Sequence, residues 1–205
     1  MLKSNRCFLS AAIICSVLFI LCGCSGRSPE PRLYMLTPVS AVEREQVSSK
    51  TDAKISVGIG PIEIADYLNQ KNIITRTNDN TINQANYDQW SGSLKDNLIT
   101  VFSENIGYLL KIDSIFVYPW RTFIPIDYQV TMDIIRFDGR LGKDVVLVAR
   151  WNLLKGKEKD ITVTKRSEIR IQTSAGSYEA LVKTLSKALS MLSTEIVNTI
   201  QDAEN

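Results

Sequence analysis

The sequence predicts an α/β sandwich in which a mixed β-sheet, part of it an antiparallel meander, is flanked by two long amphipathic helices. Apolar residues recur at helical spacing over residues 88–110 and again over 177–200. Between these stretches, three segments alternate apolar and polar residues with the period of two that is typical of half-buried strands. A further alternating segment, residues 54–60, precedes the first helix. Because a helix then connects it to later strands, the pattern favours a parallel component in the sheet.

The N-terminal segment has the composition of a secretory signal peptide. Two basic residues precede an apolar run at residues 8–21, and Gly23 offers a small residue for cleavage. The run is shorter than the roughly 20 apolar residues that a bilayer-spanning helix needs. We therefore expect residues 1–23 to be removed, residues 24–32 to form a tether, and residues 33–205 to form a single domain.

The end of this segment, Leu21-Cys22-Gly23-Cys24, resembles a bacterial lipobox: an aliphatic residue, a second position, a small residue and then the cysteine. The resemblance implies cleavage after Gly23, a diacylglycerol on the Cys24 thiol and an acyl chain on the new amino group. Three acyl chains exceed the two signals that stable membrane anchoring requires. In enterobacterial-type sorting, Asp after the cysteine retains a lipoprotein in the inner membrane. Ser25 therefore favours the periplasmic face of the outer membrane.

The charge balance of the expected mature chain is neutral. The full chain has 24 basic and 22 acidic residues, and the signal segment carries two bases and no acid, so 22 of each remain. A nucleic-acid partner would require a basic excess or stripe, and a polybasic membrane-surface binder would require a basic cluster. We expect neither, and the lipid anchor is the predicted contact with the membrane.

The residue types that most enzyme sites need are missing. The chain has no histidine, and of its four cysteines only Cys24 follows the cleavage position. A Ser-His triad, a free thiol nucleophile and a Cys/His zinc site are therefore excluded, and no Gly-x-Ser-x-Gly elbow occurs. Carboxylate pairs such as Asp127 with Asp133, or Glu63 with Asp66, are typical of turns and solvated surfaces and give little support to a periplasmic hydrolase. We expect no enzyme, no cofactor and no metal.

Short strands and one helical turn are expected before the first long helix. The strands are expected at residues 33–36, 54–60, 71–77 and 81–84, the turn at 64–68, and a polar loop at 41–54. In the second strand, aliphatic residues alternate with Ser56, Gly58 and Gly60. This predicts that a helix or another backbone segment packs closely on the small face. Pro61 is expected to end that strand, and residues 78–80 to form the turn of a strand pair.

Polar residues suited to capping precede both long helices. Asn86 or Asp88 can cap the first, and Ser177 the second. The apolar stripe of the first helix is more typical of a core-facing surface than of a cofactor site. It consists of Trp90, Leu94, Leu98, Val101, Phe102, Ile106 and Leu109.

Three long strands between the helices form the expected meander, after a short strand at residues 115–118. Their apolar sides are Tyr128, Val130, Met132 and Ile134; Val145, Leu147, Ala149, Trp151 and Leu153; and Ile161, Val163, Ile169 and Ile171. Asp138-Gly139 and residues 156–160 are expected to separate them. Lys165 and Ser167 share a side with the apolar residues of the third strand, which predicts a sheet edge or an interface there.

Several short motifs follow one another in a characteristic order over residues 33–110. They are Leu33-Tyr34-Met35-Leu36, Ile55 to Pro61, Tyr67-Leu68, Ile73-Ile74-Thr75-Arg76, and Tyr87-Asp88-Gln89-Trp90 with Leu94. This series resembles the ABC-type transport auxiliary lipoproteins, the family that includes the paraquat-inducible-type lipoprotein C. The resemblance implies a Rossmann-like fold. The chain has no nucleotide fingerprint, because Gly58-x-Gly60 is followed by Pro61 and by no third glycine.

The resemblance also implies a role: an accessory component of an envelope lipid-transport system. Its expected partners are a mammalian-cell-entry (MCE) domain protein and inner-membrane transporter components. We expect a non-catalytic lipoprotein that docks the periplasmic assembly to the outer membrane, and homo-oligomerisation would let it act as a ring or collar. A generic periplasmic scaffold or assembly lipoprotein of another envelope machine is the alternative.

Five residues are candidates for partner contact: Tyr67, Leu68, Arg76, Trp120 and Arg121. Trp and Arg are enriched in interface hot spots, which favours the last two. Purely structural roles are the alternative. Tyr67 and Leu68 can close the end of the sheet, and Arg76 can pair with Asp66 or Asp79.

Overall fold

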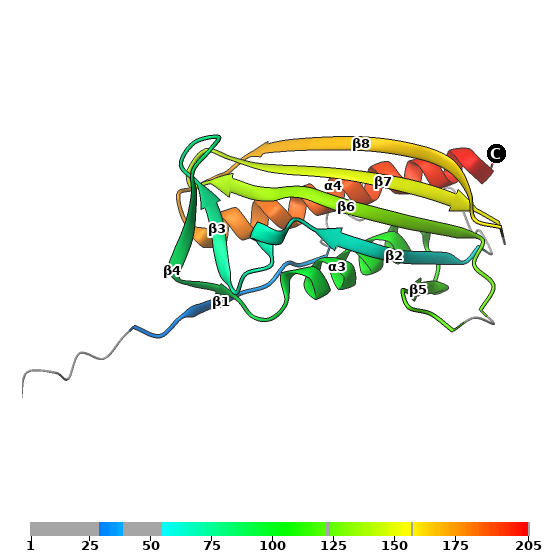
Figure 1. Ribbon diagram of the computed structural model, residues 1–205, viewed down its shortest axis with the longest axis horizontal. Helices are drawn as coiled ribbons and strands as arrows, with labels where there is room; N and C mark the ends of the chain where they lie inside the picture. Colours follow the sequence, from blue (N-terminus) through cyan, green and yellow to red (C-terminus); the bar gives the residue numbers. More distant parts are fainter. Residues whose placement is uncertain (1–28, 39–54, 122–123, 157, 205) are drawn as a thin grey trace, which may run out of the picture. The chain divides into compact units, whose positions relative to one another are not determined.

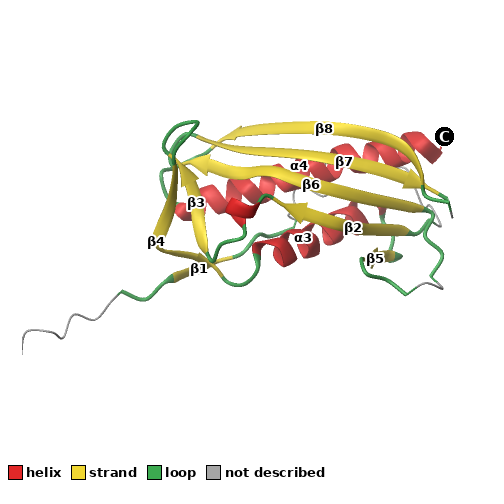
Figure 2. Ribbon diagram, in the orientation of Figure 1, coloured by secondary structure: helices red, strands yellow, loops and turns green. Residues whose placement is uncertain are grey.

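The computed structural model describes residues 29–38, 55–121, 124–156 and 158–204. The chain separates into residues 1–30 and residues 31–205, and the elements below belong to the second unit. Within its described residues they are two β-sheets, two long α-helices and a short 3₁₀ turn (Figure 1 and Figure 2). The expected loop at residues 41–54 and the predicted anchor Cys24 lie outside the described residues.

A five-stranded mixed sheet has the order β5-β2-β6-β7-β8. Its strands are β2 (Val57–Ile64), β5 (Ile115–Val117), β6 (Tyr128–Arg140), β7 (Asp144–Lys155) and β8 (Asp160–Gln172). β2 pairs in parallel with β5 and β6, whereas β6, β7 and β8 are antiparallel neighbours. The predicted meander and parallel component are therefore confirmed. β8 is an edge strand, as Lys165 and Ser167 indicated.

Both long helices, α3 (Leu94–Leu110) and α4 (Tyr178–Glu204), pack on the same face of this sheet. α3 contacts β2 and β5, α4 contacts β6, β7 and β8, and the helices contact each other (Figure 1). The core lies between these two layers. Its largest fully buried side chains include Trp151, Tyr128, Phe102 and Phe137. The predicted α/β class is confirmed, with both helices on one side.

The short N-terminal strands form a second sheet with the order β1-β4-β3. They are β1 (Arg32–Tyr34), β3 (Asn72–Arg76) and β4 (Ile82–Trp90), and the 3₁₀ turn η1 (Asp66–Leu68) precedes β3. β1 is parallel to β4, and β3 is antiparallel to it. The expected strand pair and the helical turn are confirmed. The sequence pattern did not indicate that β1, β3 and β4 form a sheet separate from the five-stranded one.

Helix α3 begins at Leu94, later than the sequence indicated. Ser93 is its N-cap, and the Ser93 hydroxyl oxygen accepts a hydrogen bond from a first-turn backbone N–H at 3.2 Å. Asn86 and Asp88 are not caps, because β4 pairs with β1 on one side and β3 on the other and so stays extended. Trp90 is only 4% exposed and is buried from the end of β4, not from the helix.

Strand β2 continues through Pro61 to Ile64, although the sequence predicted that the proline would end it. The pairing with β6 shifts register between Ile59 and Ile62, so Pro61 lies in an irregularity where its missing N–H leaves no gap in the ladder. The small face is closely packed, but side chains cover it and not the helix or backbone segment that the sequence predicted. A Cβ atom at Gly58 would lie 3.0 Å from both Trp120 Cη2 and Ile126 Cγ2.

Strand β6 runs through Asp138 and Gly139, which were expected to form a turn. The β6–β7 turn lies three residues later, at residues 141–143. Gly139 is explained by close packing: a Cβ atom there would lie 2.5 Å from the Asp144 carbonyl oxygen and 2.9 Å from Leu181 Cδ1. The Ser177 cap of α4 is confirmed, because its hydroxyl accepts the Ala180 N–H at 3.2 Å.

Candidate functional site

Two of the predicted contact residues, Tyr67 in η1 and Arg76 in β3, meet at a buried carboxylate, Asp138 of β6. The Tyr67 hydroxyl donates to Asp138 Oδ2 at 2.7 Å, and Arg76 Nε donates to the two carboxylate oxygens at 2.9 and 2.8 Å. Arg136 Nε donates to Oδ1 at 2.9 Å. The Asp138 side chain is 0% exposed, so its charge depends on these three donors.

The electrostatics of this Asp138 cluster fix the state of Tyr67. Burial, followed by the hydrogen bond to Asp138, raises the pKa of Tyr67 to about 12. The phenol therefore stays protonated and remains a donor at neutral pH. The guanidinium carbon of Arg76 lies 5.5 Å from the Tyr67 ring centroid, a cation–π distance. Both predicted partners of Arg76 are wrong: it reaches only the backbone carbonyl of Asp79, at 2.9 Å, and its carboxylate partner is Asp138.

A second ion cluster surrounds Asp144 at the start of β7. Arg140 Nε and Nη2 donate to the two carboxylate oxygens at 2.7 and 2.8 Å, and Arg170 of β8 also bonds Oδ2. The Asp144 side chain is 4% exposed. The hydrogen bond from Arg140, together with Arg170, lowers the pKa of Asp144 to about 2. The carboxylate is therefore ionised throughout the physiological range.

The indole of Trp120, another predicted contact residue, folds back over Gly58 on the outer face of β2. The Tyr118 ring lies 5.5 Å away in an edge-to-face arrangement, and Lys159 Nζ is 5.8 Å from the Trp120 ring centroid. Trp120 is half-buried, whereas Tyr118 and Arg121 are exposed. The indole thus holds the segment in place, and Tyr118 and Arg121 supply most of its accessible surface.

The predicted contact residues do not form one site. Leu68 is 2% exposed and packs in the core, so it presents almost no surface. Tyr67 follows the C-terminal end of β2, whereas Trp120 covers Gly58 near its N-terminal end. Two separate regions result: the charged clusters at one end of β2 and the aromatic segment of residues 118–121 at the other.

The sequence reasoning missed the two buried carboxylates. Asp138 was assigned to a turn, and Asp144 was not singled out. A signal was available: each lies inside or beside a long apolar strand and has an arginine two or four positions before it, Arg136 and Arg140 respectively. A charged residue in a strand that is otherwise buried indicates a buried ion pair.

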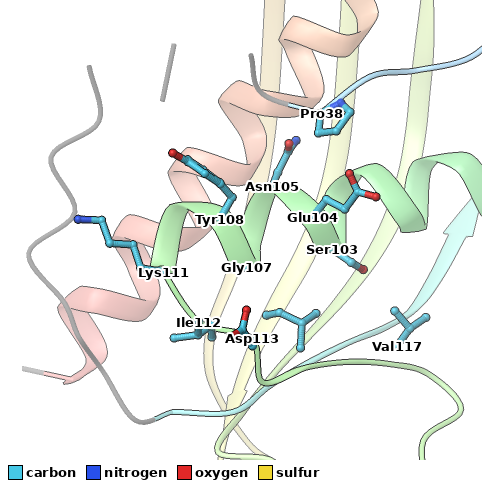
Figure 3. A pocket seen from close by; sticks show the side chains of 11 residues that line it. Pro38, Ser103, Glu104, Asn105, Gly107, Tyr108, Lys111, Ile112, Asp113 and Val117 are labelled. Carbon is cyan, nitrogen blue, oxygen red and sulfur yellow. The ribbon is translucent and has the colours of Figure 1, made fainter. Parts of the chain in front are cut away.

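A groove of about 880 Å³ runs along the C-terminal half of α3 beside β5 (Figure 3). Gly107 and Ile112 of this region lie near β5, and a Cβ atom at Gly107 would be 3.1 Å from Ile115 Cγ1. Glu104 and Asp113 also line it. The groove lies open on the surface and so differs from the enclosed sites that bury most of a small ligand.

The predicted lipid-attachment residue Cys24 lies outside the described residues, so its acylation stays a prediction. In the part of the chain that the structure describes, no helix combines the length and apolarity needed to cross a membrane.

The sequence places the chain in a class of lipoproteins that are auxiliary to transport. The chain belongs to the family described as ABC-type transport auxiliary lipoprotein component, whose model matches residues 34–197. Comparison with curated proteins gives no match. A crystal structure of an uncharacterised protein has a TM-score of 0.68 at 17% identity, covering 84% of this chain and 99% of its own. A crystal structure of a Xanthomonas campestris protein has a TM-score of 0.64 at 16% identity, covering 85% and 100%. Both likenesses show the fold.

Proposed function

We propose that this protein is a non-catalytic accessory lipoprotein of an MCE-type intermembrane lipid-transport system, which it docks to the periplasmic face of the outer membrane. The observation that carries the proposal is the family match over residues 34–197, located directly behind a lipobox at residues 21–24. The family is one of auxiliary transport components, which agrees with a docking role and not with a chemical one.

The anchor determines how far the domain lies from the membrane. Between the lipidated Cys24 and the first residue of the expected domain, Leu33, lie eight residues, 25–32. Fully extended, they span at most roughly 26–29 Å. The domain is therefore held close to the bilayer, where it positions a partner that carries lipid across the periplasm.

The surface that we assign to the partner is the exposed part of residues 118–121. Tyr118 is 53% exposed and Arg121 is exposed, and both stand on a segment that Trp120 fastens to β2. Tyr and Arg on a rigid support are common interface anchors, because little conformational entropy is lost when they are covered. A homo-oligomeric ring of the protein would repeat this surface around the lipid path.

The test of the partner surface is affinity purification of the full-length lipidated protein from its own cells in a mild detergent, with mass spectrometry of co-purifying proteins. We expect an MCE-domain protein with the wild type, a marked loss with Arg121→Glu, and no loss with the control Lys71→Glu, which changes another exposed cation. Recovery of a different machine, or of no partner in repeated crosslinked preparations, would favour the generic scaffold.

The tether is tested separately with Cys24→Ala, which removes the acylated thiol but leaves the domain unchanged. We expect the variant to leave the outer-membrane fraction and the cells to lose tolerance to membrane stress. Full complementation by this unlipidated protein would contradict the tether while leaving the partner proposal intact.

A further inference from the structure

A small basic hollow lies between the β3–β4 hairpin and the β6–β7 turn, which lie together at one end of the sheets (Figure 1). It encloses about 240 Å³. Three cationic side chains, Arg76, Arg140 and Lys143, line it together with Thr77 and Asn83. The hollow adjoins both ion clusters, because Arg76 belongs to one and Arg140 to the other.

The positive charge here exceeds what the ion clusters need. Each buried carboxylate is shared by two arginines: Arg76 and Arg136 on Asp138, and Arg140 and Arg170 on Asp144. Two of the four guanidinium charges are therefore not balanced by their carboxylates. Lys143 is exposed and adds a third positive charge.

Other acidic groups nearby offset only part of this excess. The hydrogen bond to Asp144, and to a lesser degree the charge of Asp79, raises the pKa of Arg140, which places Asp79 close to the hollow. Glu168 bonds Arg170, but it also bonds Arg166. The charges of Glu168 and Arg166 cancel each other, so this pair does not reduce the excess. The six cations and four acids named for this region therefore leave an excess of two positive charges.

Hydrogen-bond donors are also left over. In the part of the chain that the structure describes, no hydrogen bond uses Arg76 Nη2, Arg140 Nη1 or Lys143 Nζ. Thr77 Oγ1 accepts from Asn83 Nδ2 at 2.9 Å, so the proton of that hydroxyl can be donated to another acceptor. A negatively charged group with several acceptor oxygens is the kind of ligand that such donors suit.

The donors are also held in position before any ligand arrives. Asp138 and Asp144 fix the two guanidinium planes, and the turn that carries Lys143 is closed by its N–H bond to the Arg140 carbonyl at 3.0 Å. A donor set that is already ordered loses little entropy on binding. Guanidinium groups suit phosphate oxygens because their planar fork can donate two parallel hydrogen bonds.

We propose that this hollow is a binding site for an anionic phosphate group, such as the phosphodiester of a lipid headgroup or free phosphate. The site is independent of the tether and of the partner surface, because none of its residues belongs to either.

The test is isothermal titration of the full-length protein, in an uncharged detergent at low ionic strength, with three water-soluble probes. These are inorganic phosphate, glycerophosphoglycerol as an anionic headgroup phosphodiester, and zwitterionic glycerophosphocholine. We expect saturable binding of an anionic probe, weakened roughly fivefold by Lys143→Gln, the loss expected for one partly exposed charge. Among the described residues, Lys143 makes no side-chain ion pair, so this variant is expected to fold. Lys71→Gln changes another exposed lysine and is the control, which should bind as the wild type does.

The outcomes separate the two sources of the phosphate. Binding of glycerophosphoglycerol identifies a headgroup site, whereas binding of inorganic phosphate alone identifies a site for the free ion. Weakening by added salt supports either. Equal binding by Lys143→Gln and Lys71→Gln, or no saturable binding of both anionic probes, would overturn the proposal.

Discussion

The Tyr67 hydroxyl and the Asp138 carboxylate, 71 positions apart in the chain, are joined by a 2.7 Å hydrogen bond. Arg76 bonds the same carboxylate, so η1, β3 and β6 meet at one buried charge. Because Arg76 lies in β3 and Asp138 in β6, their ion pair links the three-stranded sheet to the five-stranded sheet. It also places Arg76 at the edge of the basic hollow.

Removing the shared carboxylate should strongly destabilise the fold. We expect Asp138→Ala to lower the free energy of unfolding by about 3–5 kcal/mol, because it leaves Arg76 and Arg136 without their buried partner. Urea unfolding followed by circular dichroism measures this. Asp133→Ala is the control, since it removes an exposed carboxylate from the same strand and should change stability by about 0.5 kcal/mol or less.

Removing only the Tyr67 hydroxyl should lower the free energy of unfolding by about 1.5–3 kcal/mol, the typical contribution of a hydrogen bond to a charged group. Tyr67→Phe tests this, with Tyr87→Phe, at a residue 46% exposed, as the control. The folded-state pKa of Tyr67, about 12, lies above its ordinary value of 10.0. The contribution should therefore be complete below pH 10 and decrease from pH 10 to 12. A difference from wild type that already decreases between pH 7 and 9 would disagree with this assignment.

The stabilisation from Asp144 should depend on pH in the opposite sense to that from Tyr67, because it is lost at low pH and not at high pH. Its folded-state pKa, about 2, lies below the ordinary 3.8, so its contribution is present above pH 4 and is lost as the pH falls toward 2. We expect wild type to exceed Asp144→Asn by about 2 kcal/mol at pH 6, with the gap closing between pH 4 and 2. Thermal unfolding across this range measures the gap. A gap that is constant from pH 6 to 2 would rule out the ion cluster as its cause.

Two glycines should respond differently to the same change. Gly139→Ala would place a methyl group 2.5 Å from the Asp144 carbonyl oxygen, so β6 and β7 must separate locally, at a cost of about 1–3 kcal/mol. A methyl group at Gly92 meets nothing within 4 Å, so Gly92→Ala should be neutral or stabilise by up to about 1 kcal/mol. Denaturant midpoints of the two variants provide the comparison. Equal midpoints would show that the strands tolerate the closer approach.

The sequence predicted the helices and the meander because their patterns are long and locally consistent. β6, β7 and β8 are each at least 12 residues long and contain stretches that alternate apolar and polar residues, and α4 has a regular apolar stripe over 27 residues. Trp90 was misassigned for the same reason. It lies four positions before Leu94 and continues the helical stripe, but pairing with β1 and β3 overrides that pattern.

The contact residues were harder to predict than the elements that carry them. Arg76 was singled out as a candidate for partner contact, which stays a prediction, and its intramolecular partner was sought among nearby acids, whereas Asp138 lies 62 positions away. Burial of Leu68 and the folding back of Trp120 over Gly58 depend likewise on what packs against them. Local patterns contain no information about such neighbours.

The lipobox prediction for Leu21 to Cys24 needs only the linear sequence, because a signal peptide is recognised by the order and type of its residues. The alternation of β6 and the apolar stripe of α4 can also be recognised from the linear sequence, because the spacing of the apolar residues indicates which face is buried. The basic hollow is different. Its cations come from β3, β6 and the β6–β7 turn, and only the tertiary fold brings these elements together around one hollow. The same fold decides which carboxylates are buried beside the arginines, and therefore how much positive charge is left for a ligand.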